Sequence, residues 1–270
     1  MGTHAIYTVT DFPSNYTKIS EDEAYKKRVA AEGKTWNEAA AELEIAQGIN
    51  AAKAASDPEV LRTLEKFVFS TLTGIKTVSG GKYPNAFQFD SKATIEQHIR
   101  TQKPELAKRL STMNLGMYQE NMRDLPLVFG PRKEKGGTYS FLRLKWPGQH
   151  EAHPEVVAAK DTGAFVESLV LDHPAGTDVL GATEIITKAD YAALWGRVMG
   201  VKAVVKDVPE EELAKYLPED LKDELPDFFK FIAEYGYTGG NSAVKTPEEL
   251  GIKTSSLADF FREEDWNKVL

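Results

Sequence analysis

Thr10, Asp11 and Phe12 are the first residues in the chain that could contact a ligand. They follow a short apolar run at residues 4–9 (HAIYTV), whose β-branched and aromatic side chains predict a strand. Open α/β sheets bind ligands at the carboxyl ends of their strands, which makes these three residues candidates for a pocket. The turn chemistry of Asp11 and Pro13 explains the same residues without a ligand, and both interpretations stay open.

His150 and His153 have the spacing of two metal ligands on one helical turn. Pro147 and Pro154 disfavour a helix over this segment, and no third ligand is apparent nearby. We therefore expect no metal site. The sequence contains no Gly-x-Ser-x-Gly segment to support a Ser–His–Asp triad, and its lack of cysteine excludes thiol catalysis.

The elements that must position these residues alternate between helix and strand in the first half of the chain. Residues 14–35 are polar and predict a loop, and residues 36–55, rich in Ala, Leu and Glu, predict a long helix. Residues 66–73 (KFVFSTLT) form a continuous apolar run that is typical of a buried strand. A helix at 91–100 and a strand at 110–118 follow. This alternation predicts βαβ units and a parallel sheet.

The second half of the chain is less regular. Residues 138–146 (TYSFLRLKW) alternate in polarity and predict an antiparallel strand. Asp161 is a plausible N-cap for a helix that runs to Leu171. Residues 187–190 (TKAD) resemble a capping box that opens a helix ending near Gly200. We expect an α/β unit followed by a smaller α+β portion.

Composition excludes several classes of protein. The 270 residues are 41% hydrophobic, which is ordinary for a globular protein, and no apolar stretch is long enough for a transmembrane helix. The formal net charge of −8 opposes binding to nucleic acid, so a small organic ligand is expected instead. The lack of cysteine and of a secretory signal fits a cytoplasmic protein.

Seven short segments, in this order and spacing, resemble the NmrA-like proteins, which are atypical relatives of the short-chain dehydrogenases/reductases. The segments are residues 7–12 (YTVTDF), 44–50 (EIAQGIN), 68–72 (VFSTL), 81–84 (GKYP), 89–92 (FDSK), 161–163 (DTG) and 234–237 (EYGY). The resemblance extends over essentially the whole chain.

The resemblance implies a partial Rossmann-like parallel sheet. Residues 1–12 resemble the fourth strand of the family, so the first three strands would be missing, together with the GxxGxxG loop that binds a dinucleotide. It also implies two domains. A truncated Rossmann-like domain would comprise 1–122 and 157–183, and a smaller substrate or partner domain 123–156 and 184–270.

The resemblance implies a set of site residues. Lys92 matches the lysine of the family, Ser70 falls near its serine, and Tyr118 is a candidate proton donor, because Gln88 stands where reductases of the superfamily carry tyrosine. Without the resemblance, each of the three has an ordinary structural explanation. Cofactor contacts would come from Thr10, Asp11, Phe12 and Lys92, and substrate contacts from Asn114, Gly116, Met117 and Asn121.

Three functions remain open. The favoured one is a redox-neutral enzyme that isomerises, rearranges or cyclises a small organic substrate in the remaining pocket. The first alternative is an NAD(P)H-dependent oxidoreductase whose cofactor site is completed by another chain. The second is a non-catalytic regulator that senses NAD(P). The missing glycine-rich loop weakens binding of NADP(H) but leaves it open.

The first strand is expected to form an exposed sheet edge, because its partners in the family would be missing. An apolar edge without charged residues is usually covered. Self-association through residues 4–9, folding back of residues 14–35, or membership of a longer chain would each cover it. We expect a homo-oligomer.

Overall fold

The chain divides into two units, each built from several separate segments. The computed structural model describes residues 2–148 and 150–266. Unit 1 consists of Met1–Asn114, Val166–Val179 and Ser242–Lys245, and unit 2 of Leu115–Phe165, Leu180–Asn241 and Thr246–Leu270. The division predicted from the sequence is also interleaved, but its first boundary falls at residue 122 and not at 114.

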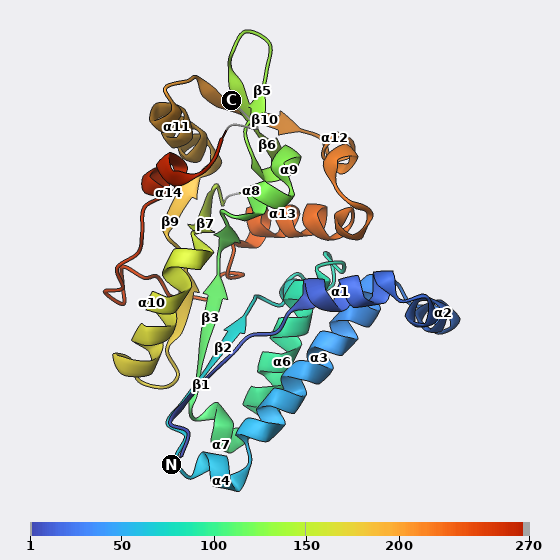
Figure 1. Ribbon diagram of the computed structural model, residues 1–270, viewed down its shortest axis with the longest axis vertical. Coiled ribbons are helices and arrows are strands. Elements are labelled where there is room, and N and C mark those ends of the chain that lie inside the picture. Colours follow the sequence, from blue (N-terminus) through green and yellow to red (C-terminus); the bar gives the residue numbers. More distant parts are fainter. Residues whose placement is uncertain (1, 149, 267–270) are drawn as a thin grey trace. The chain divides into compact units, whose positions relative to one another are not determined.

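A five-stranded sheet is the centre of unit 1. Its order is β1-β2-β3-β8-β11, and the pairs β1–β2, β2–β3 and β8–β11 are parallel (Figure 1). The strands are β1 (Ala5–Thr8), β2 (Lys66–Thr71), β3 (Leu110–Leu115), β8 (Asp178–Gly181) and β11 (Val244–Lys245). All residues of β2 after Lys66 are buried, as its continuous apolar sequence predicts for a strand covered on both faces.

Two long helices pack against each other in unit 1. In α3 (Trp36–Ala55), Thr35 and Glu38 form a capping box, and the helix packs on α6 (Phe87–Gln102). Gly48 permits this close approach, because a Cβ there would lie 2.4 Å from the Ile95 side chain. Three short helices complete this part: α4 (Pro58–Leu61), α5 (Ile75–Val78) and α7 (Pro104–Ala107).

Most of residues 14–35 lie in two helices, and the loop predicted there is wrong. Asp11 caps α1 (Phe12–Glu21) by accepting a hydrogen bond from the Ser14 N–H, and Pro13 occupies the first turn. Asp22 caps α2 (Glu23–Ala31) in the same way. Asp and Pro are favoured both in turns and at helix starts, which is why the sequence is ambiguous here.

Strand β1 lies at the edge of its sheet. Among the described residues it pairs with β2, and α1 and α2 pack along α3 and not over the β1 edge (Figure 1). Folding back of residues 14–35 over this edge, one of the three alternatives for covering it, is therefore not observed. Tyr7 remains 39% exposed, and Val9, just after the strand, 60%.

Unit 2 contains two three-stranded sheets. In the first, β6 (Tyr139–Leu144) lies between β5 (Arg132–Lys133) and β10 (Ala203–Val208). It is antiparallel to β5 as expected but parallel to β10. The second has the order β4-β7-β9, from β4 (Met117–Tyr118), β7 (Ala152–Val156) and β9 (Glu184–Thr187).

An aromatic cluster forms the core of unit 2, centred on the fully buried Trp195 of α11 (Lys188–Met199). Phe141 and Trp266 contact it with ring centroids 5.5 and 5.4 Å away. The other helices of the second half are α8 (Asn121–Asp124), α9 (Pro126–Phe129), α10 (Ala158–Leu171), α12 (Glu210–Leu213), α13 (Glu224–Tyr235) and α14 (Leu257–Glu263), with 3-10 turns at Ala214–Tyr216 and Glu219–Leu221.

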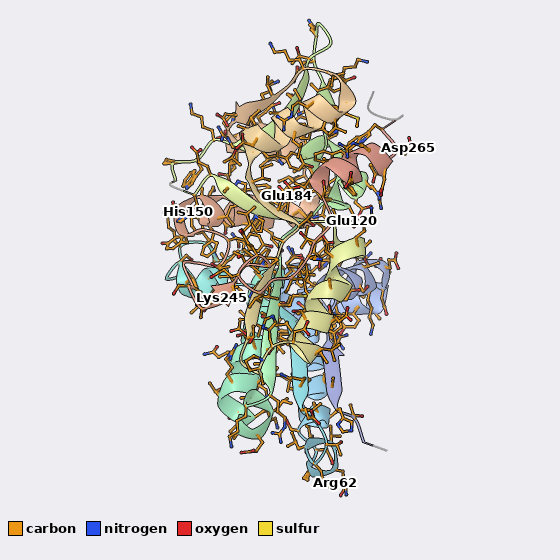
Figure 2. All side chains as sticks on the ribbon, turned by 90° about the vertical axis from the view of Figure 1, so that its left-hand side faces the viewer. Arg62, Glu120, His150, Glu184, Lys245 and Asp265 are labelled. Atoms are coloured by element: carbon orange, nitrogen blue, oxygen red, sulfur yellow. The ribbon has the colours of Figure 1, made fainter. Side chains whose placement is uncertain are left out.

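Helix α10 begins three residues earlier than predicted. Glu120 binds its first turn by accepting hydrogen bonds from the N–H groups of Ala158 and Ala159, at 3.3 and 3.0 Å (Figure 2). Asp161 is not the N-cap; it is buried inside the helix, where its carboxylate accepts hydrogen bonds from Thr183 and Ser255.

No helix among the described residues is long and apolar enough to span a membrane.

Candidate functional site

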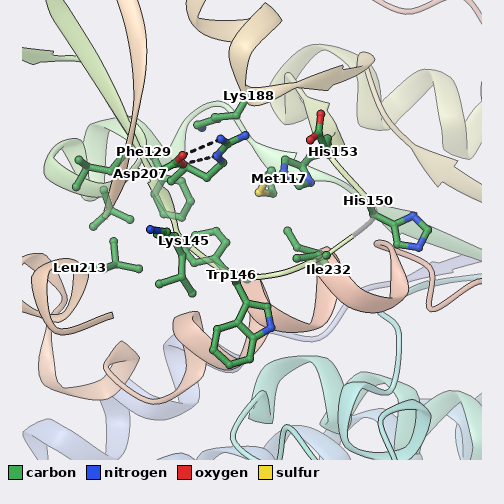
Figure 3. A pocket seen from close by; sticks show the side chains of 18 residues that line it. Met117, Phe129, Lys145, Trp146, His150, His153, Lys188, Asp207, Leu213 and Ile232 are labelled. Carbon is green, nitrogen blue, oxygen red and sulfur yellow. Dashed lines mark hydrogen bonds and ion pairs between the residues drawn. The ribbon is translucent and has the colours of Figure 1, made fainter. Parts of the chain in front are cut away.

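A pocket with a cavity volume of about 190 Å³ lies within unit 2. A bound water needs about 10–15 Å³ of such volume, so the pocket has room for a small organic molecule. Its apolar lining comes from Met117, Val128, Phe129, Leu142, Leu144, Trp146, Leu213, Phe229, Ile232 and Ala233. Its polar lining comes from Arg143, Lys145, His150, Glu151, His153, Lys188 and Asp207 (Figure 3).

Strand and helix ends place the polar groups of the pocket. Arg143 lies near the end of β6, and Lys145 directly follows that strand. His153 lies on β7, and Lys188 is the first residue of α11. Antiparallel pairing of β7 with β9 sets His153 opposite Ile186, two residues before Lys188. These side chains are therefore brought together by sheet register and not by proximity in the sequence.

The Arg143 guanidinium is engaged by Asp207. Its Nε and Nη2 donate to the two carboxylate oxygens of Asp207 at 2.6 and 3.0 Å, as the dashed lines in Figure 3 show. This bidentate hydrogen bonding raises the pKa of Arg143 and lowers the pKa of Asp207. The pair is thus charged and mutually neutralising, which leaves Lys145 and Lys188 as the other cations of the lining.

Lys188 has no carboxylate within ion-pair distance of its Nζ among residues 2–148 and 150–266. Its Nζ lies instead over two rings, 4.8 Å from the Tyr191 centroid and 5.8 Å from that of Phe141. Burial lowers the pKa of Lys188, and the charge of Glu155 opposes this effect. A lysine of this kind is a better base and nucleophile than one in water.

A buried hydrogen-bonded chain lies beside Lys188. The Tyr191 hydroxyl donates to Gln119 Oε1 at 2.7 Å, and Gln119 Nε2 donates to Glu155 Oε2 at 2.6 Å. Burial raises the pKa of Glu155 to about 7, although the Lys188 charge and the Gln119 hydrogen bond lower it. Burial also raises the pKa of Tyr191, so its proton stays on the phenol and fixes the direction of the chain.

His153 is a neutral imidazole at physiological pH. Burial, together with the positive charges of Lys188 and Arg143, lowers its pKa to about 4. A neutral imidazole can accept a proton or a hydrogen bond from a ligand. His150 also lines the pocket, but no group of three or more metal-ligating side chains occurs in the part of the chain that the structure describes.

The residue matched to the lysine of the family lies in unit 1 and is engaged in a buried ion pair. Lys92 Nζ contacts the Glu44 carboxylate, whose side chain is fully buried, and also donates to the Thr10 carbonyl at 3.3 Å. Ser91 donates to the same carboxylate. The ion pair therefore ties α6 to α3.

The other unit 1 candidates lie in ordinary structural positions. Asp11 caps α1, and Phe12 belongs to the core between α1 and α3. Ser70, buried on β2, is hydrogen-bonded to Tyr7 on the neighbouring strand. Asn114 is the penultimate residue of β3, and its Oδ1 is buried without a partner among the described residues. Their proposed ligand roles stay predictions.

Four of the site residues predicted from the sequence lie in unit 2, and one of them, Met117, lines the pocket. Tyr118, its neighbour on β4, is 40% exposed and is not among the lining residues. Gly116 allows close backbone approach, because a Cβ there would lie 2.4 Å from the Pro154 carbonyl oxygen. Asn121 begins the short helix α8, outside the lining.

Sequence reasoning missed Lys188, Glu155 and Gln119. One signal was available, because a lysine at the first position of a helix opposes the helix dipole, and the TKAD segment places Lys188 there. Glu155 carried no such signal. Its burial depends on the β4-β7-β9 sheet, which the sequence does not reveal.

The residues of unit 1 do not by themselves form a dinucleotide site. The sequence has no GxxGxxG loop, and the α1 N-terminus is capped by the Asp11 carboxylate, which would repel a phosphate. The Lys92 ammonium, which would hold the ribose in a reductase, is neutralised by Glu44.

Comparison with solved structures defines the class of fold. NmrA, a negative transcriptional regulator solved in complex with NADP, is similar with a TM-score of 0.65 and 16% identity, over 97% of this chain and 74% of that chain. A triphenylmethane reductase from Citrobacter sp., solved with NADP(H), has a TM-score of 0.57 and 13% identity, over 97% and 76%. An NADPH-dependent quinone oxidoreductase from Escherichia coli, complexed with NADPH, has a TM-score of 0.55 and 16% identity, over 95% and 98%. Identities this low show the fold alone, which is Rossmann-like.

The sequence profile of the NmrA-like family matches residues 29–261. The chain belongs to the NmrA-like family, which confirms the resemblance; six of the seven segments lie within the matched range, and residues 7–12 lie outside it. No curated protein sequence matches the chain significantly.

Proposed function

We propose that this chain is a redox-neutral enzyme that isomerises, rearranges or cyclises a small organic substrate in the unit 2 pocket. One observation carries the proposal: a lysine that has no carboxylate partner among the described residues and a neutral histidine line a cavity of about 190 Å³, and a buried carboxyl group with a pKa of about 7 acts on the lysine through its charge. The pKa values of Lys188 and Glu155 are both shifted towards neutral pH, as acid–base catalysis requires.

Each polar group has a distinct role in the proposed chemistry. Lys188 binds the oxygen of the substrate where negative charge develops, and His153 accepts a proton from a neighbouring carbon or oxygen. Glu155 holds or releases a proton near neutral pH and is kept in place by Gln119. The apolar wall, including Leu142 and Phe129, excludes water and strengthens these interactions.

The alternative is the NAD(P)H-dependent oxidoreductase. Its support is the similarity of fold to the quinone oxidoreductase and the triphenylmethane reductase, which were solved with their cofactor. The ion pair of Lys92 with Glu44 argues against it, because a reductase needs that ammonium for the cofactor. The remaining alternative, a regulator, is supported here by nothing more than the similarity of fold to NmrA.

A metabolite assay without added cofactor distinguishes these functions. The purified chain is incubated with a small-molecule extract, and products are followed by liquid chromatography and mass spectrometry. A redox-neutral enzyme converts a compound into one of the same mass, or of a mass lower by water, at a new retention time. A reductase adds the mass of two hydrogen atoms and only when NADPH is supplied.

Variants assign the activity to the pocket. Lys188→Met and His153→Phe should abolish the conversion, while the exposed Lys53→Met in unit 1 serves as the matched control and should leave it unchanged. A conversion that survives Lys188→Met, or that requires NADPH, would refute the proposal.

A further inference from the structure

Resting on the proposed function, we infer that Lys188 is an amine nucleophile that forms an iminium with an aldehyde or ketone substrate. The inference narrows the substrate class from a small organic molecule to a carbonyl compound. It concerns a covalent step, which acid–base catalysis alone does not require.

The position of Lys188 supports this role. Its side chain is half-buried and lines the cavity, and no carboxylate among the described residues is close enough to form an ion pair with it. As the first residue of α11, it lies at the positive end of the helix dipole, which disfavours a second positive charge. Aromatic faces from Tyr191 and Phe141 hold the Nζ in place. Burial and the positive end of the helix dipole favour the uncharged amine that attacks a carbonyl, although the ring faces also attract the charged form.

The charged and titratable groups around Lys188 come from its own helix and from strands β6, β7 and β10. Glu155 and His153 are on β7, and Tyr191 is one turn along α11. Arg143 on β6 is positive but is neutralised by Asp207. Of these groups, Glu155 is the one whose pKa is raised to about 7, so its charge, which acts on the amine through space, changes near neutral pH.

The step balances without an oxidant or reductant. The Nζ lone pair forms a bond to the carbonyl carbon, and the carbonyl π electrons move to oxygen, which takes up a proton released by Nζ. The carbinolamine hydroxyl then takes up a proton from solvent and leaves as water, and a C=N⁺ bond forms. The iminium withdraws electrons from the adjacent carbon, so a proton is lost there easily, and His153 is the neutral base in the same pocket.

The rest of the lining suggests the shape of the substrate. Apolar side chains, including Leu142, Leu144 and Phe129, suit a flat or apolar body, and Lys145 adds an exposed positive charge in the same lining. An aromatic or unsaturated carbonyl compound with an acidic group fits this distribution.

Reductive trapping tests the inference. The chain is incubated at pH 7.5 with 4-carboxybenzaldehyde and cyanoborohydride, and the labelled lysines are identified by peptide mass spectrometry. Lys188 should be labelled faster than Lys145, which lines the same pocket but is exposed. The difference should shrink as the pH rises towards 10.5, the ordinary pKa of a lysine, because the lowered pKa of Lys188 then gives it less of an advantage. Lys188→Met should remove the principal adduct, and Lys53→Met should not.

A matched ligand without the aldehyde separates the two levels of the proposal. Terephthalate has the shape of the probe but cannot form an iminium, and its binding can be followed by the fluorescence of Trp146, which lines the pocket. If terephthalate binds and Lys188 is labelled no faster than Lys145, the covalent role is overturned and the proposed function stands. If terephthalate does not bind and Lys188 is not labelled, both are overturned. Preferential labelling of Lys188 supports both.

Discussion

Replacing Lys92 by methionine tests whether this lysine is structural. The substitution removes the cation that faces the fully buried Glu44 carboxylate, while the length of the side chain is largely kept. Breaking a buried ion pair from one side costs about 3–5 kcal/mol, because the remaining charge has no compensation. A chain of this size has an m-value in urea of about 3 kcal/mol/M, so the unfolding midpoint should fall by about 1–1.7 M.

A double variant provides the internal control. Glu44→Gln together with Lys92→Met leaves an uncharged pair that can still accept the Ser91 hydrogen bond. Replacing both members of a buried pair is often close to neutral, so we expect the double variant to regain at least about 2 kcal/mol relative to Lys92→Met. Lys53→Met, on the exposed face of α3, should stay within about 0.5 kcal/mol of the parent chain.

Urea unfolding followed by far-ultraviolet circular dichroism measures these differences. If Lys92→Met unfolds at the midpoint of the parent chain, the ion pair does not stabilise α3 against α6. In that case Lys92 would again be available as a ligand residue. Equal destabilisation in the single and double variants would also contradict the reasoning, because it would show no coupling between the two charges.

Three further predictions concern stability, each compared with the parent chain by urea unfolding. Glu155 keeps its proton to about pH 7 in the folded state but loses it near pH 4.5 when unfolded, so its contribution to stability is greatest below pH 4.5 and is lost as the pH rises through 7. The difference in unfolding free energy between the parent chain and Glu155→Gln should therefore shift in favour of the parent as the pH falls from 8 to 5. A difference that does not change with pH would be inconsistent with the burial of Glu155. Gly48→Ala should destabilise by about 1–3 kcal/mol through its clash with Ile95, whereas Gly163→Ala, with open space around it in α10, should stabilise by about 0.5–1 kcal/mol, and similar effects at both sites would contradict the packing argument. Gly116→Ala should cost about 2 kcal/mol or more, because its Cβ would meet the Pro154 backbone, and a neutral result would show that β4 and β7 lie further apart.

The fold could be predicted where local sequence and tertiary structure agree. The apolar run at 66–73 contains β2, and the Ala-rich segment at 36–55 is α3 with the same bounds, because propensity and burial point the same way. The prediction failed at residues 14–35 and at Asp161. In both places an aspartate is compatible with more than one local structure, and contacts distant in the sequence decide which one forms.

The candidate site could be predicted only in part. Met117 was expected to contact substrate and does line the pocket. Lys188 and Glu155 are brought near each other by the pairing of β7 with β9, which no periodicity in the sequence encodes. The Glu44 carboxylate beside Lys92 was missed for a similar reason, because the partners of an interhelical ion pair follow from packing and not from spacing.

Calorimetric titration of NADPH into the purified chain tests the central claim most directly. The proposed chemistry uses the acid–base groups of the unit 2 pocket and no nicotinamide, because the Lys92 ammonium is paired with the Glu44 carboxylate. It predicts no binding heat at millimolar NADPH. Micromolar binding would contradict it and would place the NAD(P)H-dependent oxidoreductase ahead of the redox-neutral enzyme.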